Sequence, residues 1–170
     1  MIDICSICVI IIIIASERRG KQMAVFKTDS VNSTASIGER LGAVLNEGDI
    51  VAMFGDLGAG KTSFVRGVVQ GLGINPDIVS SPTFSLVNEY RGEKILYHFD
   101  MYRINGWDDL YSTGYFDYID TQYILIIEWS ENIESVLPEN CIRVSIEKTE
   151  NENERIINIG RGENFEDIGC

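Results

Sequence analysis

The sequence has few of the residues that build disulfide frameworks or metal clusters. Its 170 residues include four cysteines, one histidine and three prolines. Cys5 and Cys8 are closely spaced, but Cys141 and Cys170 provide no second pair, so a zinc or dithiol site is not indicated. This cysteine usage favours a reducing cytoplasm.

Basic residues are also scarce. The chain has 14 Lys and Arg against 26 Asp and Glu, which gives a formal net charge of −12. Strong direct binding to nucleic acid or to an anionic membrane requires a basic surface. We therefore expect neither, and any role near RNA to depend on a protein partner.

No apolar run is long enough to cross a membrane. Residues 2–15 are nearly all apolar but too few for a span, and Asp3 stands where a signal peptide would be positive. Residues 17–20 read Glu-Arg-Arg-Gly, which an AGGAGG ribosome-binding site would encode, shortly before Met23. We expect residues 1–22 to be a translated leader, 23–160 to form one domain and 161–170 to be a tail.

The most informative segment is residues 50–71. An apolar run at 50–54 predicts a buried strand, and residues 63–71 have the spacing of a helix. Between them, residues 55–62 read Gly-Asp-Leu-Gly-Ala-Gly-Lys-Thr, a full match to the G-x-x-x-x-G-K-[ST] phosphate loop. This pattern predicts a site for a nucleoside triphosphate.

The residue types of the loop fit this chemistry. Glycine lets backbone N–H groups surround a phosphate, and the following helix directs its positive end at the same anion. Lys61 would bind the phosphates and Thr62 would ligate Mg²⁺, whereas Asp56 would shape the loop. The predicted nucleotide-binding residues here are Gly55, Asp56, Leu57, Gly58, Ala59, Gly60, Lys61, Thr62 and Ser63.

The remaining chain alternates between predicted strands and helices. We expect a helix after residues 24–28, capped by Asp29 or Ser30, with a capping box at 36–39 as an alternative start. The other predicted strands are 24–28, 84–90, 94–100, 123–127, 141–147 and 155–159, and the other predicted short helices begin at 106 and 131. Residues 141–147 and 155–159 should form an antiparallel pair.

A phosphate loop needs a further carboxylate beside the metal, usually at the end of an apolar strand. Asp100 and Glu128 each end such a run. We favour Glu128 as the metal ligand and Asp100 as the group that positions or deprotonates water, and the reverse assignment stays open. His98 is predicted to be packed or hydrogen-bonded rather than a general base, and Trp107 and Trp129 to be core or partner contacts.

Four motifs in order resemble the TsaE (YjeE) family of bacterial ATPases, which act in tRNA threonylcarbamoyladenosine biosynthesis. They are the phosphate loop, Ser-Pro-Thr-Phe at 81–84, His-Phe-Asp-Met-Tyr-Arg at 98–103, and Glu-Trp at 128–129. The resemblance covers about residues 24–159. It implies an α/β fold of the P-loop NTPase type, a three-layer sandwich with a mixed central sheet.

The resemblance also implies an ATPase that uses ATP and Mg²⁺ and works with the TsaB–TsaD pair. It assigns phosphate binding to Lys61, metal binding to Thr62 and Glu128, an essential role to Asp100 beside the metal, and γ-phosphate sensing to Thr83. In this sequence Thr113-Gly114 replaces a usual Leu-Gly, and residues 151–153 replace a Gly-Arg pair in the late hairpin.

Two other functions fit the same phosphate loop. One is a binding module in which ATP stabilises an assembly without required hydrolysis. The other is a small-molecule kinase, although the basic residues beyond Lys61 are too scattered to suggest the Arg-bearing lid of a kinase.

Overall fold

The computed structural model of the chain describes residues 11–12 and 23–161. The predicted leader and tail therefore lie outside the described residues, apart from Ile11–Ile12 and Arg161. Among the described residues, no helix is long and apolar enough to cross a membrane.

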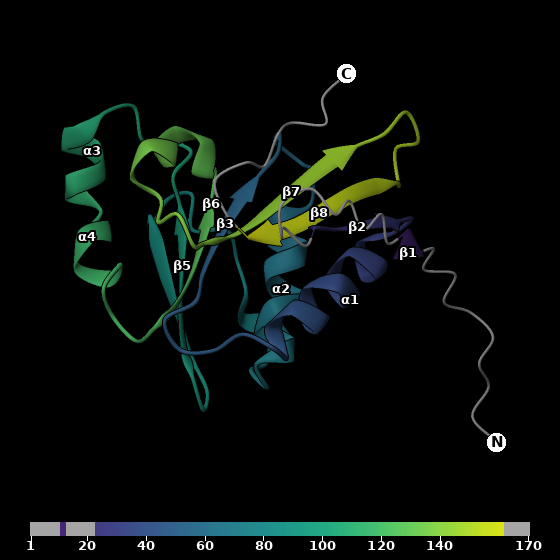
Figure 1. Cartoon of the computed structure of the whole chain (residues 1–170), viewed down its shortest axis with the longest axis horizontal. Coiled ribbons are helices and arrows are strands. Elements are labelled where there is room, and N and C mark those ends of the chain that lie inside the picture. The colour runs from purple at the N-terminus through teal and green to yellow at the C-terminus, as the bar shows by residue number, and fades with distance from the viewer. Residues whose placement is uncertain (1–10, 13–22, 162–170) are drawn as a thin grey trace.

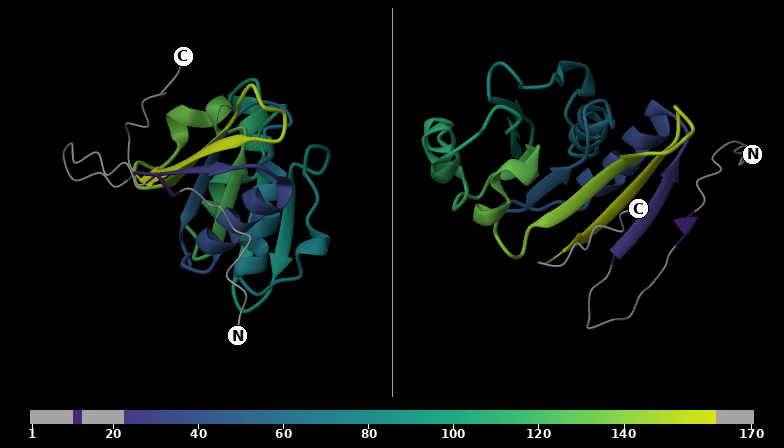
Figure 2. Two further views of the ribbon diagram at one scale, coloured as in Figure 1. Left: turned by 90° about the vertical axis from the view of Figure 1, so that its right-hand side faces the viewer. Right: turned by 90° about the horizontal axis from the view of Figure 1, so that it is seen from above.

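One mixed sheet of eight strands forms the middle layer (Figure 1). The strand order is β1-β2-β8-β7-β3-β6-β5-β4, with neighbouring strands parallel from β7 to β5 and antiparallel elsewhere. The strands are β1 Ile11–Ile12, β2 Met23–Thr28, β3 Ile50–Phe54, β4 Val87–Arg91, β5 Ile95–Asp100, β6 Ile124–Glu128, β7 Ile142–Lys148 and β8 Arg155–Arg161. The late strands β7 and β8 form the predicted antiparallel pair, beside β2 (Figure 2).

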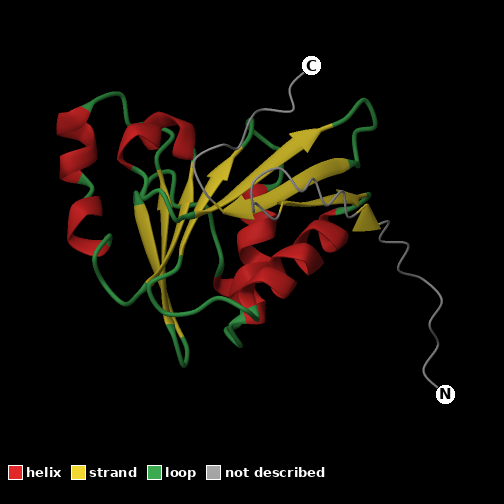
Figure 3. Ribbon diagram, viewed as in Figure 1, coloured by secondary structure: helices red, strands yellow, loops and turns green. Residues whose placement is uncertain are grey.

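Helices cover both faces of this sheet (Figure 3). The helices α1 Val31–Gly42 and α2 Lys61–Gly71 pack on one face, and the short helices α3 Trp107–Ser112 and α4 Tyr115–Tyr118 lie on the other. Two 3-10 helices complete the description, η1 Pro76–Ile78 and η2 Ser130–Val136. The predicted three-layer α/β fold with a mixed central sheet is confirmed.

The two cores explain why β6 is apolar at every position before its final glutamate. Ile124 and Ile126 belong to the core beneath α1 and α2, whereas Leu125 and Ile127 belong to the core on the other face. Successive side chains of a strand point to opposite faces, so a strand covered on both sides has no polar alternation.

Local capping sets where α1 begins. Ser30 is the N-cap and exchanges hydrogen bonds with Ser33 in a capping box, so the predicted cap at Ser30 is confirmed. The alternative start at 36–39 is wrong, because those residues lie inside the helix. The helix after the phosphate loop also begins two residues earlier than predicted, at Lys61.

The strand predicted at residues 84–90 begins three residues later than expected, at Val87. Leu86 has a φ of 67°, in the left-handed region, and its N–H donates to Pro82 O at 2.7 Å. This turn delays β4 until Val87 and keeps residues 80–86 as a loop against the end of β5.

Four glycines bring α1 and α2 unusually close. Gly38 and Gly42 on α1 and Gly67 and Gly71 on α2 are each one helical turn apart. A Cβ placed on Gly67 would lie 1.9 Å from Ala35 O, and a Cβ on any of the other three would lie 2.2 Å from a backbone oxygen of the facing helix. The absence of side chains at these positions therefore sets the distance between the two helices.

We expect Gly67→Ala to destabilise the fold. Helix propensity alone would raise the free energy of unfolding by about 1 kcal/mol. The clash with α1 should instead lower it by about 1–3 kcal/mol. Urea unfolding would measure the difference, with the exposed Gln70→Ala on the same helix as a control that stays within about 0.5 kcal/mol of wild type. A Gly67→Ala protein more stable than wild type would contradict this account of the packing.

Candidate active site

The phosphate loop joins the end of β3 to the start of α2 and has the backbone that its glycines predicted. Gly55, Gly58 and Gly60 have φ values of 132°, 73° and 111°, which glycine adopts without strain. Gly55 also packs tightly, since a Cβ there would lie 2.3 Å from Ile146 O. The first turn of α2 directs its free N–H groups to the concave side of this loop.

Lys61 is buried at the base of the loop. Its Nζ donates to the carbonyl oxygens of Gly55 and Asp56, and lies 3.8 Å from the centre of the Trp129 ring. Burial lowers the pKa of Lys61, and the charge of Glu128 partly opposes this effect. The ammonium group is thus held by loop oxygens that a phosphate could replace.

The sheet places the two predicted carboxylates next to each other. In the parallel register Met53 of β3 is paired with Glu128 of β6, and Glu128 is paired with Asp100 of β5. Adjacent strands are about 4.8 Å apart. The phosphate loop begins two residues after Met53, so loop and carboxylates share one edge of the sheet.

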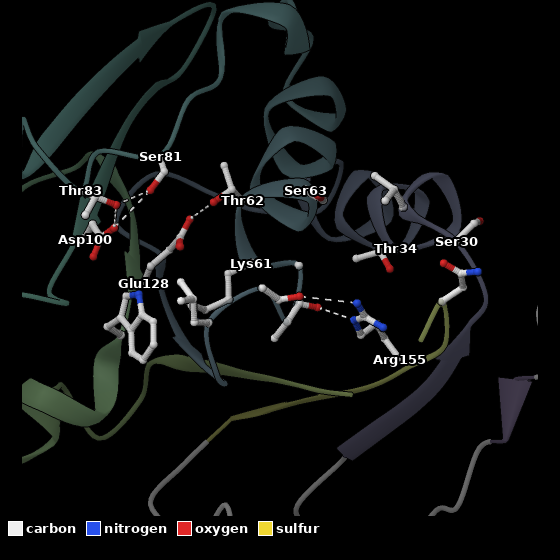
Figure 4. A pocket seen from close by; sticks show the side chains of 17 residues that line it. Ser30, Thr34, Lys61, Thr62, Ser63, Ser81, Thr83, Asp100, Glu128 and Arg155 are labelled. Atoms are coloured by element: carbon white, nitrogen blue, oxygen red, sulfur yellow. Dashed lines mark hydrogen bonds between the residues drawn. The ribbon is translucent and has the colours of Figure 1, made fainter. Parts of the chain in front are cut away.

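Asp100 is buried and is held by the loop before β4. Its Oδ2 accepts hydrogen bonds from Thr83 Oγ1 at 2.6 Å and from Ser81 Oγ at 3.2 Å (Figure 4). Its Oδ1 accepts a hydrogen bond from the N–H of Tyr102 at 2.9 Å. These three hydrogen bonds fix the orientation of the Asp100 carboxyl group at the edge of the cavity.

Glu128 is equally buried and faces α2. Its Oε1 lies 3.0 Å from Thr62 Oγ1, which donates to it, and 2.9 Å from His98 Nε2. His98 is fully buried and hydrogen-bonded, as predicted. The next residue, Trp129, has a φ of 58°, and its ring lies against Lys61 and Tyr102. The other tryptophan, Trp107, has 64% of its surface exposed and is therefore not a core residue.

The phosphate loop, Asp100 and Glu128 line a cavity of about 420 Å³. The predicted site residues that line it are Leu57, Gly58, Ala59, Gly60, Lys61, Thr62, Ser63, Thr83, Asp100 and Glu128. Gly55 and Asp56 do not line it. Gly55 packs on β7, and Asp56 is exposed and offers its carbonyl to Lys61, in keeping with a loop-shaping residue.

Sequence reasoning missed the far wall of the cavity. Ser30 is the N-cap of α1, Thr34 lies in its first turn, and Arg155 begins β8 (Figure 4). Asn153, from the turn between β7 and β8, lines the cavity as well. Arg155 Nε donates to Ala59 O at 2.8 Å, which fixes the hairpin against the phosphate loop. The two residues are 96 positions apart, so no local sequence pattern indicates this contact.

The oxygen atoms at the cavity suit Mg²⁺. Thr62 Oγ1 and the carboxylates of Glu128 and Asp100 are hard oxygen donors, which Mg²⁺ prefers. In the part of the chain that the structure describes, no group of three or more His, Cys, Asp and Glu side chains could hold a metal by itself. Nucleotide sites commonly bind Mg²⁺ through one or two carboxylates together with phosphate oxygens, so these residues fit that role.

Comparisons with known proteins identify relatives of this chain. The sequence pattern of the family described as "Threonylcarbamoyl adenosine biosynthesis protein TsaE" matches residues 28–157. The tRNA threonylcarbamoyladenosine biosynthesis protein TsaE of Treponema pallidum is 40% identical over 117 residues, which cover 69% of this chain and 86% of that protein. The protein of the same name from Bacillus subtilis is 34% identical over 142 residues, which cover 83% and 88%.

A solved structure is similar as well. The crystal structure of Bacillus subtilis YdiB superposes with a TM-score of 0.68 at 29% sequence identity, over 86% of this chain and 90% of that one. The similarity therefore extends over most of the described domain and not only over the phosphate loop. From this coverage and identity we conclude that the chain belongs to the TsaE family of threonylcarbamoyladenosine biosynthesis proteins.

Proposed function

We propose that the chain is a Mg²⁺-dependent ATPase required for threonylcarbamoyladenosine modification of tRNA, and that it works with the TsaB–TsaD pair. One observation carries the proposal: the glycine loop, Thr62, Asp100 and Glu128 meet at a single cavity. The proposal includes a cytoplasmic location, which suits the buried free thiol of Cys141.

In this proposal the residues of the loop bind the triphosphate. The N–H groups at the start of α2 and the Lys61 ammonium group hold the β- and γ-phosphates, and Lys61 exchanges its loop carbonyls for phosphate oxygens. Thr62 and Glu128 hold Mg²⁺, helped by Asp100 in the same cavity. When bound, Mg²⁺ neutralises the charge that develops on the phosphate oxygens.

Asp100 then positions the attacking water or accepts its proton. Thr83 donates to Asp100 Oδ2, so a movement of the loop that carries Thr83 would also move this carboxylate. A hydroxyl there is suited to detect the γ-phosphate. The reverse assignment, with Asp100 as the main metal ligand, has the same residues in exchanged roles.

The partner in the proposal is a protein rather than RNA. The chain has a formal net charge of −12, which opposes direct contact with a phosphate backbone. Under this proposal the TsaB–TsaD pair holds the tRNA, and ATP hydrolysis in this chain resets that pair between rounds of modification.

Loss of the loop cation should weaken nucleotide binding. We expect Lys61→Ala to raise the dissociation constant for ATP by about 10- to 100-fold, because a charge-assisted hydrogen bond contributes about 1.5–3 kcal/mol. Calorimetric titration with ATP and Mg²⁺ would measure this. The exposed Arg40→Ala removes the same charge elsewhere and should bind as wild type does. Equal affinity in the Lys61→Ala protein would speak against a phosphate site at this loop.

The separate roles of Asp100 and Glu128 can be distinguished by comparing how each substitution changes ATP turnover and the Mg²⁺ concentration that turnover requires. We expect Asp100→Asn to lower ATP turnover by about 10²- to 10⁴-fold, with a smaller rise in Mg²⁺ requirement than Glu128→Gln causes. Glu128→Gln should chiefly raise the Mg²⁺ concentration needed for half-maximal turnover. Exchanged outcomes would establish the reverse assignment. Turnover at the wild-type level in both variants would refute the catalytic site, and the exposed Asp77→Asn serves as the control.

Reconstituted tRNA modification tests the biological role. Threonylcarbamoyladenosine should form over repeated cycles only when this chain is present, and TsaB–TsaD should increase its ATP turnover. Full modification with Glu128→Ala would favour the assembly module without required hydrolysis. Transfer of phosphate to a metabolite would favour the kinase. Among the described residues that line the cavity, the only basic side chains are Lys61 and Arg155, which are fewer than an Arg-bearing kinase lid would provide.

A further inference from the structure

The orientation of Glu128 depends on a buried histidine. Glu128 is 2% exposed and His98 is fully buried, so each polar group needs a hydrogen-bonding partner. A carboxylate oxygen only accepts hydrogen bonds, so His98 Nε2 carries the hydrogen and donates to Oε1 at 2.9 Å. Thr62 donates to the same oxygen. Oε2 receives no hydrogen bond from the described residues and remains for a cation.

The other side of the histidine ring is held as well. His98 Nδ1 lies 3.4 Å from Tyr90 Oη, and the single hydrogen of that hydroxyl can be donated either to Nδ1 or to Ser80 O, which lies 3.2 Å away. Asn88, which is paired with His98 across β4 and β5, donates to Ser80 O at 3.1 Å. Tyr90 is 3% exposed, so the ring of His98 sits between two buried groups that fix its angle.

One loop therefore supports both carboxylates. Ser81 and Thr83 bond Asp100 directly, whereas Ser80 is connected to Glu128 through Tyr90 and His98. These contacts come from separate residues of the same short segment. Any displacement of the loop would act on both acids.

We propose that His98 is a positioning residue that aligns Glu128 for Mg²⁺, and that Tyr90 holds His98 in the required orientation. This inference rests on the proposed function. It differs from a purely structural role, because a structural histidine would affect stability without changing the requirement for the metal. Groups that orient a metal ligand change metal affinity by about 10- to 100-fold when removed.

Mn²⁺ binding to the full chain tests this proposal. Free Mn²⁺ would be measured by electron paramagnetic resonance in the presence of a non-hydrolysable ATP analogue. We expect His98→Leu to weaken Mn²⁺ binding by about 10- to 100-fold. Affinity for the analogue in EDTA should stay within about 2-fold of wild type, because no phosphate contact has changed. His98→Gln offers an amide N–H near the position of Nε2 and should restore most of the Mn²⁺ affinity.

Tyr90→Phe is the gentler variant and decides the matter if His98→Leu does not fold. It retains the buried ring and should weaken Mn²⁺ binding by about 3- to 10-fold, because Nδ1 loses its support while the bond to Glu128 remains. Tyr115→Phe is the matched control, since Tyr115 is fully buried and its hydroxyl donates to Val136 O at 3.4 Å in the other core. It should bind Mn²⁺ as wild type does.

The outcomes separate this inference from the proposed function. If wild type binds Mn²⁺ with the analogue but Tyr90→Phe and a folded His98→Leu protein bind it within 2-fold of wild type, the positioning role is refuted and the ATPase stands. If wild type does not bind Mn²⁺ in the presence of the analogue, both are refuted. If His98→Leu weakens metal binding and His98→Gln restores it, the role is established.

Discussion

The parallel register of β3, β6 and β5 is the constraint on which the site depends. It pairs Met53 with Glu128 and Glu128 with Asp100, so the phosphate loop and two acids from distant parts of the chain meet at one sheet edge. A slip of one residue in β5 or β6 would turn its carboxylate to the opposite face. Apolar side chains in two cores oppose such a slip, because alternate residues of β6 must enter alternate cores.

Much of this arrangement could be predicted because it follows local rules. The phosphate loop combines a short motif with a strand before it and a helix after it, and the glycines have the conformations that the motif requires. Asp100 and Glu128 could be selected as acids that end apolar runs. The general rule that parallel sheets bind ligands at the carboxyl ends of their strands then placed them together.

Other features depend on contacts that a single sequence does not reveal. The capping box of α1 uses Ser33 where the usual pattern has Glu or Gln, so it escaped the pattern. The start of β4 depends on the left-handed conformation of Leu86, a residue with no preference for it. The wall formed by Arg155 follows from the sheet order, since β7 is next to β3 and carries the hairpin to the loop. His98 could be assigned a buried hydrogen bond, but its partner could not be identified.

The bond from Arg155 to Ala59 O has a consequence for biosynthesis. The two residues are 96 positions apart, and β7, which leads to Arg155, also pairs with the strand that carries the phosphate loop. At about 5–20 residues per second, a ribosome adds that length of chain in roughly 5–20 s. During that interval the nascent chain has a nucleotide loop without the hairpin part of its far wall, which carries Asn153 and Arg155. The pocket is therefore completed only after β8 has been synthesised.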